Sequence, residues 1–175
     1  MRRNMMILFA AASLIFGAVS VQAATMVKIG IVDLQGALNA TAEGQAAKES
    51  LKKKHTTKQE EVDRMKADLD LMEEKIKSPV LSETAQAELK EKYLQKRSEL
   101  IEFVTAAKDE EERENQLLST RILEGLVKIA QEIAEAEKFT LILEKNGSGV
   151  IFYEDAMDIT EQVVKIYNER YQVGQ

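Results

Sequence analysis

Few side chains in this chain of 175 residues could carry out chemistry, and they do not form a catalytic or metal-binding pattern. The chain holds one histidine, His55, and no cysteine. Zinc sites use three or four ligands, drawn mainly from His, Cys and carboxylates. His55 follows the lysines Lys52–Lys54, and the sequence offers no second His and no Cys to share a metal with it. We therefore interpret His55 as a solvated residue of a helical arm and expect no metal site.

Three aspartates are the remaining candidates for chemistry. Asp33 ends an apolar run, while Asp155 and Asp158 precede a helical pattern. General acid/base catalysis needs paired carboxylates in a pocket that shifts their pKa values. Aspartates at strand ends and helix starts more often cap the neighbouring backbone. With no glycine-rich phosphate loop either, the sequence predicts a protein that is not an enzyme, needs no ATP and holds no cofactor.

The first residues have the pattern of an export signal. Arg2 and Arg3 are followed by the apolar run Met5–Val19 and by Val21-Gln22-Ala23, which places small residues where signal peptidase cleaves. The run is shorter than the roughly 20 apolar residues of a transmembrane helix. We therefore expect a signal peptide over residues 1–23 and a mature protein in the periplasm.

The charge of the mature chain argues against a nucleic-acid partner. Removing residues 1–23 takes away two of the 24 Lys and Arg and none of the 30 Asp and Glu, so the formal net charge changes from −6 to −8. An acidic protein repels phosphate overall. A local basic run, Lys52–Lys54, could still make a weak contact with lipid headgroups or lipopolysaccharide.

The composition predicts long helices between two short regions of strands. One proline and eight glycines leave few forced turns, and residues 43–138 are rich in Glu, Lys, Ala, Gln and Leu. We expect strands at Val27–Asp33, Phe139–Leu143 and Val150–Tyr153. Asn146-Gly147-Ser148-Gly149 should turn the last two into a hairpin. A final helix should start at Asp158, with Glu161 completing a capping box, and run to about Tyr171.

The pattern of the long helical region predicts an antiparallel helical hairpin. Val62, Met65, Leu69, Met72 and Ile76 follow a heptad seam, which stops at Ser78-Pro79. A second helix should begin after an N-cap at Ser82, with the apolar stripe Leu89, Tyr93, Leu100 and Phe103. Paired residue numbers should sum to about 162, which sets the apolar residues side by side and places Lys52–Lys54 opposite an acidic run, Lys108–Glu112. The basic run is then better explained by ion pairs within the hairpin than by phosphate binding.

The hairpin should protrude from a small body. The seam is interrupted by Lys48, His55 and Lys58, and the stretch Lys108–Gln116 has no apolar residue. The second helix alone would be about 85 Å long, far more than a compact domain of this size allows. We expect an arm over residues 45–137 with its tip near 78–82, and a body made of residues 24–44 and 138–175.

The body is too small to supply an ample core alone, so we expect it to form oligomers. The fold class predicted is therefore α+β, mostly α, with a small β-containing oligomerisation body and a long protruding antiparallel helical hairpin. The candidate oligomerisation residues are Val27, Ile29, Ile31, Leu141, Leu143, Val150 and Phe152.

This arrangement resembles the Skp/OmpH family of periplasmic chaperones. The resemblance rests on the signal peptide, the first strand Val27–Asp33, the charged helical hairpin, the segments Phe139–Leu143 and Val150–Tyr153, and the helix start Asp158-Ile159-Thr160. It implies a homotrimer whose three arms enclose a cavity. There the protein would hold unfolded outer-membrane β-barrel proteins and prevent their aggregation. This chain departs from the better-known members in being acidic rather than basic.

Two functions remain open from the residues. One is an ATP-independent holdase for unfolded envelope proteins, and the other is a trimeric coiled-coil adaptor or spacer with a fixed partner. A spacer should carry an unbroken seam for rigidity, so the interrupted seam favours the holdase. The candidate client-contact residues on the arm are Met65, Met72, Val80, Leu81, Leu94, Ile101 and Val104.

Overall fold

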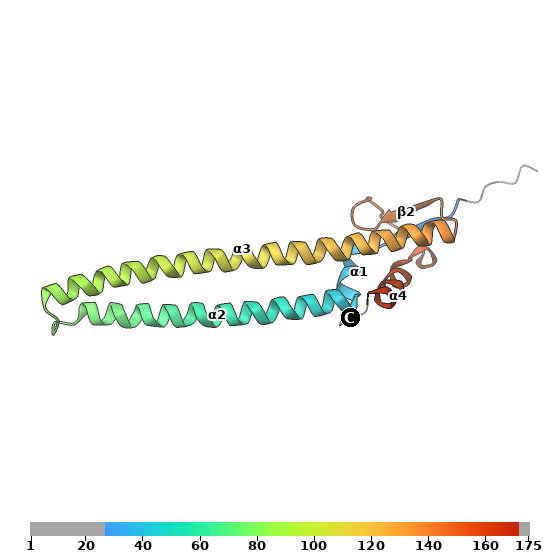
Figure 1. Cartoon of the computed structure of the whole chain (residues 1–175). Coiled ribbons are helices and arrows are strands. Elements are labelled where there is room, and N and C mark those ends of the chain that lie inside the picture. Colours follow the sequence, from blue (N-terminus) through green and yellow to red (C-terminus); the bar gives the residue numbers. More distant parts are fainter. Residues whose placement is uncertain (1–26, 172–175) are drawn as a thin grey trace, which may run out of the picture.

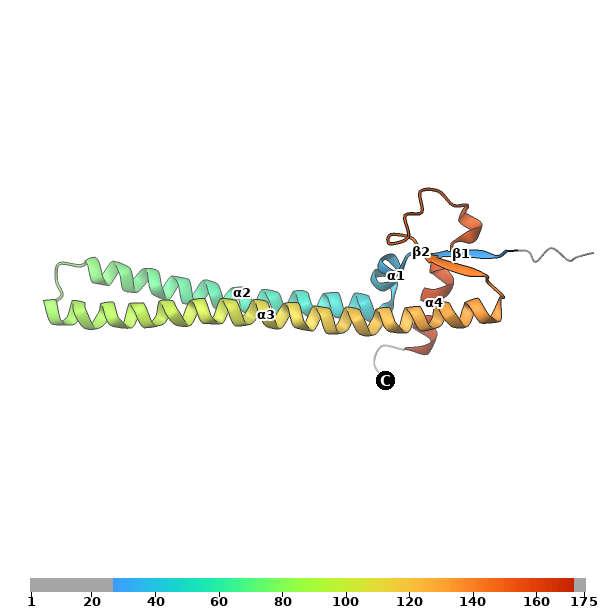
Figure 2. The same ribbon diagram turned by 90° about the horizontal axis from the view of Figure 1, so that it is seen from above.

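The protein folds as a long two-helix arm attached to a small body. The structure is a computed structural model and describes residues 27–171. The expected signal peptide, residues 1–23, lies outside this range. The arm is formed by α2 (Ala42–Lys77) and α3 (Glu83–Ala136), which run antiparallel and side by side to a tip at residues 78–82 (Figures 1 and 2). The predicted hairpin and the mostly helical α+β fold class are thus confirmed.

Each arm helix begins at a side-chain cap, as the sequence indicates. The Thr41 hydroxyl oxygen accepts a hydrogen bond from the backbone N–H of Gly44 at 3.0 Å, which starts α2. The Ser82 hydroxyl accepts one from Ala85 at 3.2 Å, which confirms the predicted N-cap of α3. α2 ends at Ser78, directly before Pro79, because the residue preceding proline is disfavoured in the helical region.

The body contains a two-stranded sheet and three short helical elements. β1 (Ile29–Val32) pairs in parallel with β2 (Leu141–Glu144), and Ile31 lies opposite Leu143. α1 (Leu34–Ala40) follows β1, the short 3-10 helix η1 spans Asp155–Met157, and α4 (Thr160–Arg170) crosses the body end of α3 (Figure 2).

The hydrophobic core lies where α3 enters the body. Ile122, Leu126, Ile129 and Ile133 form one stripe of α3 and are all nearly inaccessible to solvent. α1, the sheet and α4 pack against this stripe. The core consists of Val32, Ala37, Ile122, Leu126, Ile129, Ala130, Ile133, Ile159, Val163 and Tyr167.

The predicted third strand is wrong. Residues 150–154 are outside any helix or strand, and the exposed side chains of Ile151 and Phe152 point away from the core. The chain does turn after β2, where the Glu144 carboxylate accepts a hydrogen bond from the Gly147 N–H. It does not fold back as a hairpin, however. The second edge of β1 is occupied instead by a bridge between Ile31 and Asp158, and Ile159 N–H donates to the Ile31 carbonyl at 2.9 Å.

One short helix was missed in the sequence analysis, and the start of another was misplaced. α1 was not predicted at all, although Asp33 caps it by accepting a hydrogen bond from the Gly36 N–H at 2.6 Å. α4 begins one residue later than expected, with Ile159 as its N-cap and without the predicted capping box. The bridge to Ile31 holds the backbone of Asp158, which is the residue before the N-cap. From there its carboxylate accepts a hydrogen bond from the Thr160 N–H at 2.8 Å, at the start of α4.

The contacts between the arm helices lie on both sides of the predicted register. Val62 and Leu69 are buried between the helices, as the heptad seam requires. The interhelical ion pairs, however, join Lys54 to Glu114, His55 to Glu111 and Lys58 to Glu110. Each acid lies four to six residues further along α3 than a sum of 162 would place it. These side chains are long, however, and the Lys58 ammonium that pairs with Glu110 also lies 5.5 Å from the centre of the Phe103 ring, where the residue numbers sum to 161. The ion pairs therefore do not contradict a register of about 162.

The packing around α3 gives a first prediction. Leu126→Ala should destabilise the protein by about 2–5 kcal/mol, because it leaves a cavity in the only core of the described chain. Leu94→Ala, which trims an exposed side chain of the same helix, should change the free energy of unfolding by at most about 0.5 kcal/mol. Urea unfolding followed by circular dichroism measures both. Equal effects of the two substitutions would contradict this placement of the core.

Candidate functional site

The middle of the arm is joined by ion pairs rather than by apolar packing. Lys54 Nζ lies 2.6 Å from Glu114 Oε1, His55 Nδ1 lies 3.1 Å from Glu111 Oε2, and Lys58 Nζ lies 3.1 Å from Glu110 Oε2. We call these three pairs the ion-pair ladder. The hydrogen bond from Lys58 and its positive charge hold the pKa of Glu110 below its usual value. Exposed pairs of this kind contribute only about 0–1 kcal/mol each, so they orient the helices more than they stabilise them.

The ladder accounts for Lys54 of the basic run and for the lone histidine. Lys54 and His55 both face acidic side chains of α3, as the interpretation of an intra-hairpin role predicts. Lys52 and Lys53 are exposed. Among residues 27–171, no three His, Asp or Glu side chains gather closely enough to hold a metal ion.

The arm also exposes apolar side chains away from the seam. Of the seven predicted client-contact residues, Val80, Leu94, Ile101 and Val104 are 88%, 55%, 58% and 43% exposed. Met65, Met72 and Leu81 are half-buried. Leu71 is as exposed as Leu94 and was missed, because it lies outside the heptad pattern of α2. The exposed members on α3, namely Leu94, Ile101 and Val104, follow a spacing of seven and three, so they lie on one face of the helix.

The body exposes a second apolar group. Val27, Leu141 and Phe152 are well exposed, and Ile151, which the prediction omitted, is fully exposed. Ile29, Leu143 and Val150 are half-buried. Ile31 was predicted to contact a second copy, but it is only 2% exposed within its own chain. It therefore belongs to the core, because β1 turns it toward the interior, and it is not available to a partner.

The loop that carries Ile151 and Phe152 is held in place at its ends by polar contacts. The Tyr153 hydroxyl donates to Asp158 Oδ2 at 3.0 Å, and Asn146 Nδ2 donates to Asp33 Oδ1 at 3.2 Å. Burial alone would raise the pKa of Asp158. The hydrogen bonds from Thr160 and Tyr153 outweigh that effect and hold its pKa below the ordinary value. Asp33 and Asp158 thus have structural roles, as the sequence suggests, and Asp155 starts the short 3-10 helix.

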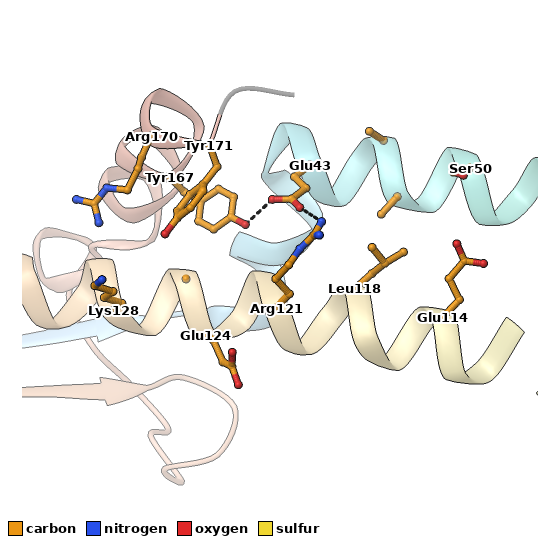
Figure 3. Close-up of a pocket in the computed structure, with 13 residues that line it drawn as sticks. Glu43, Ser50, Glu114, Leu118, Arg121, Glu124, Lys128, Tyr167, Arg170 and Tyr171 are labelled. Atoms are coloured by element: carbon orange, nitrogen blue, oxygen red, sulfur yellow. Dashed lines mark hydrogen bonds and ion pairs between the residues drawn. The ribbon is translucent and has the colours of Figure 1, made fainter. Parts of the chain in front are cut away.

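A large open cavity lies where the arm meets the body (Figure 3). Its volume is about 900 Å³, and its walls come from the first turns of α2, the middle of α3 and the end of α4. The Glu43 carboxylate lies at its edge, where it accepts a hydrogen bond from the Tyr167 hydroxyl at 2.6 Å and forms an ion pair with Arg121 (Figure 3). Burial, reinforced by the Glu43 carboxylate, raises the pKa of Tyr167, so its hydroxyl stays protonated and donates.

The structure gives no sign that the cavity is a built ligand site. Every buried side-chain nitrogen or oxygen in the described part of the chain already has a hydrogen-bond partner, so no buried polar group points unpaired into it. The Glu43–Arg121–Tyr167 cluster was not predicted. Its members lie 78 and 124 residues apart from Glu43 along the chain. The only local signal is an acid in the first turn of a helix, which is common.

Comparison with known proteins places this architecture in a family. The sequence model of the family described as "Outer membrane protein (OmpH-like)" matches residues 28–167. The chain belongs to the OmpH-like family. The fold of this OmpH-like chain is similar to the crystal structure of a candidate OmpH-like outer membrane chaperone from Caulobacter crescentus, with a TM-score of 0.76 at 20% identity. The alignment covers 86% of this chain and 89% of that one. No curated protein matches it.

Within residues 27–171, no helix combines the length and the apolar character that crossing a membrane requires.

The contacts of Asp158 give a prediction about pH. An acid whose pKa is lowered on folding stabilises the protein above its unfolded pKa, ordinarily 3.8, and this contribution is lost as the pH falls through the lower folded value. Asp158→Asn should therefore lower the melting temperature more at pH 7 than at pH 3. Asp155→Asn, in the same segment, is the matched control and should show little difference between the two. Equal losses at both pH values for Asp158→Asn would show that its charge is unimportant.

Proposed function

We propose that this OmpH-like protein is an ATP-independent holdase chaperone of the periplasm that binds unfolded outer-membrane β-barrel proteins and prevents their aggregation. The observation that carries the proposal is the distribution of apolar side chains along the arm. Leu94, Ile101 and Val104 are exposed on one face of α3, away from the seam with α2, and charged residues separate them. Such a surface offers many weak contacts and no tight pocket, which suits a client that must stay unfolded and leave again.

The ion-pair ladder supports a holdase over an adaptor or spacer. A rigid coiled-coil spacer needs apolar packing along its whole length. In this arm the packing gives way to three exposed ion pairs between the seam and the body. Long lysine side chains tolerate small changes in helix spacing, so the arm can adapt to clients of different shape.

The body supports a homotrimer, which we propose as the working form. Within residues 27–171, β2 is paired only on the side of β1, and its other edge carries backbone groups that no described strand pairs. Long exposed strand edges invite pairing with another chain. The extended segment 150–154, with Ile151 and Phe152 exposed, is suited to pair with the β2 edge of a neighbouring copy. A head-to-tail contact closes into a ring when the rotation between neighbouring copies closes, and a rotation of one third of a turn would place three arms around one cavity.

A contact with membrane lipid or lipopolysaccharide has less support. The basic residues Lys54 and Lys58 are already engaged by acids of α3. The acidic net charge also disfavours phosphate surfaces. The exposed Val80 at the tip is a single apolar residue and does not by itself make a membrane anchor.

The trimer has a direct test. Phe152→Asp should shift the mature protein from trimer to monomer, because it places a charge in an apolar interface while leaving the core of the chain intact. Val80→Asp, an equally exposed apolar residue at the arm tip, is the matched control and should stay trimeric. Size-exclusion chromatography with light scattering gives the mass. A wild-type monomer, or a Phe152→Asp trimer, would contradict the proposed interface.

The holdase activity is tested on the arm face itself. Replacing Leu94, Ile101 and Val104 by Ser should weaken client binding by roughly 10- to 100-fold, since three partly buried apolar contacts of about 0.5–1 kcal/mol each are lost. The measurement is the concentration needed to keep a urea-unfolded β-barrel protein soluble after dilution. Leu117→Ser with Val127→Ser, two exposed apolar residues of α3 near the body, is the control. A wild-type trimer that leaves the client to aggregate would favour the adaptor.

A further inference from the structure

The first turn of α2 is fastened to the body at several points. Thr41, the one residue between α1 and α2, is fully buried, and its hydroxyl donates to the Leu38 carbonyl at 2.9 Å. The N–H of Ala42 donates to Asn168 Oδ1 of α4 at 2.9 Å. Gly44 lies so close to the Leu38 carbonyl that a Cβ there would be 2.0 Å from that oxygen. The start of α2 is therefore fitted tightly to α1 and α4.

Glu43 is the side chain that ties this turn to both other helices. One carboxylate oxygen pairs with Arg121 of α3 and the other accepts from the Tyr167 hydroxyl of α4 (Figure 3). Tyr167 is itself 2% exposed and crosses α3 at Gly125, where a Cβ would lie 2.8 Å from its ring. The Tyr167 end of this contact thus cannot move without disturbing the core.

Just beyond this turn, α2 has little contact with α3. The cavity of about 900 Å³ lies on one side of the helix pair, and a second of about 390 Å³, lined also by α1, lies on another. Ala47 of α2 and Leu118 of α3 line both cavities, so these two apolar side chains lie between the cavities, where the helices face each other. Farther out, the ion-pair ladder joins the helices through long side chains.

The mechanics of a hairpin make the fastened turn important. When two helices that lie side by side bend together, one must slide along the other, because neither helix stretches easily. The tip, residues 78–82, and the seam at Val62 and Leu69 hold α2 against α3 in the outer part of the arm. Between that seam and the body, neither the contact at Ala47 and Leu118 nor the ladder resists a small slide strongly. The stiffness of the arm then depends on whether α2 is held at its other end.

We propose that Glu43 is a positioning residue for the arm: by joining α2 to Arg121 of α3 and Tyr167 of α4, it prevents α2 from sliding and keeps the arm stiff. α3 is embedded in the core and α2 is not, so release of this contact lets α2 shift about Thr41 while the body stays folded. If the proposed holdase function is correct, Glu43 thereby sets the width of the space between the arms. The proposal concerns the free protein and is tested without a client.

Because the chain has no cysteine of its own, spin labels attach only at cysteines that are introduced. Spin labels at Lys53→Cys on α2 and Gln131→Cys on α3, both exposed, report sliding along the arm. Labelled mature chain is diluted with unlabelled chain, so that only distances within one chain are seen by double electron–electron resonance. In the otherwise wild-type protein we expect one narrow distribution, and with Glu43→Ala one about twice as broad. Glu49→Ala, an exposed acid of α2 with no ion pair among the described residues, should leave the width unchanged.

Two more variants separate positioning from general damage. Tyr167→Phe removes one hydroxyl and leaves the pair with Arg121, so the distribution should broaden by an intermediate amount. Glu43→Gln keeps an oxygen to accept a hydrogen bond and should also fall between wild type and Glu43→Ala. Circular dichroism must show unchanged helix content in each. A distribution in Glu43→Ala as narrow as in wild type would overturn the proposal, whereas failure of the aggregation assay in the wild type would count only against the holdase.

Discussion

The burial of one stripe of α3 is the interaction on which the remaining structure depends. Ile122, Leu126, Ile129 and Ile133 fall on one face of this helix, and α1, the sheet and α4 all pack against it. β1 and β2 are four residues each and would not be stable as an isolated pair. The body is therefore not a separate domain to which an arm has been added. It is formed around the last third of a helix whose first two thirds are the arm.

This constraint explains why the arm is loosely packed. Toward the tip, α3 has a single neighbour, and α2 covers only one side of it. Val62 and Leu69 are buried there, but residues on the other faces, such as Leu94 and Ile101, are not covered by any of residues 27–171. A continuous seam would need apolar residues at the ladder as well, where Lys54, His55 and Lys58 stand instead. The arm thus gains length at the expense of apolar burial.

How far the sequence predicts this fold depends on whether a signal is local. The hairpin and its tip follow from heptad spacing, one proline and the Ser82 cap, all of which act within a few residues, and they are correct. The individual ion-pair partners do not follow from the heptad pattern, because a long side chain such as Lys58 reaches both Phe103 and Glu110. The helix α1 has only seven residues, too few for a periodic signal to stand out. The contact of Glu43 with Tyr167 joins distant segments and leaves no pattern at either.

The failed third strand is informative in a different way. Val150-Ile151-Phe152-Tyr153 has the composition of a strand, because β-branched and aromatic residues suit a pleated, half-buried surface. Propensity does not say which strand will be its partner, and within one chain Asp158 already occupies the free edge of β1. The segment is left extended, with polar contacts at Asn146 and Tyr153 holding its ends. A strand-like segment that is held in position but unpaired is what pairing between copies requires.

The two exposed apolar surfaces differ in a way that fits two kinds of contact. On the body, Ile151 and Phe152 are adjacent and lie on a loop near an open sheet edge, so a partner gains backbone hydrogen bonds and apolar burial together. Such a contact is strong enough to be permanent. On the arm, Leu94 and Ile101 are separated by charged residues and by two turns of helix, and no backbone group is free. Each contact there would be weak, so in the proposed holdase a bound chain could exchange them one at a time and be released without ATP.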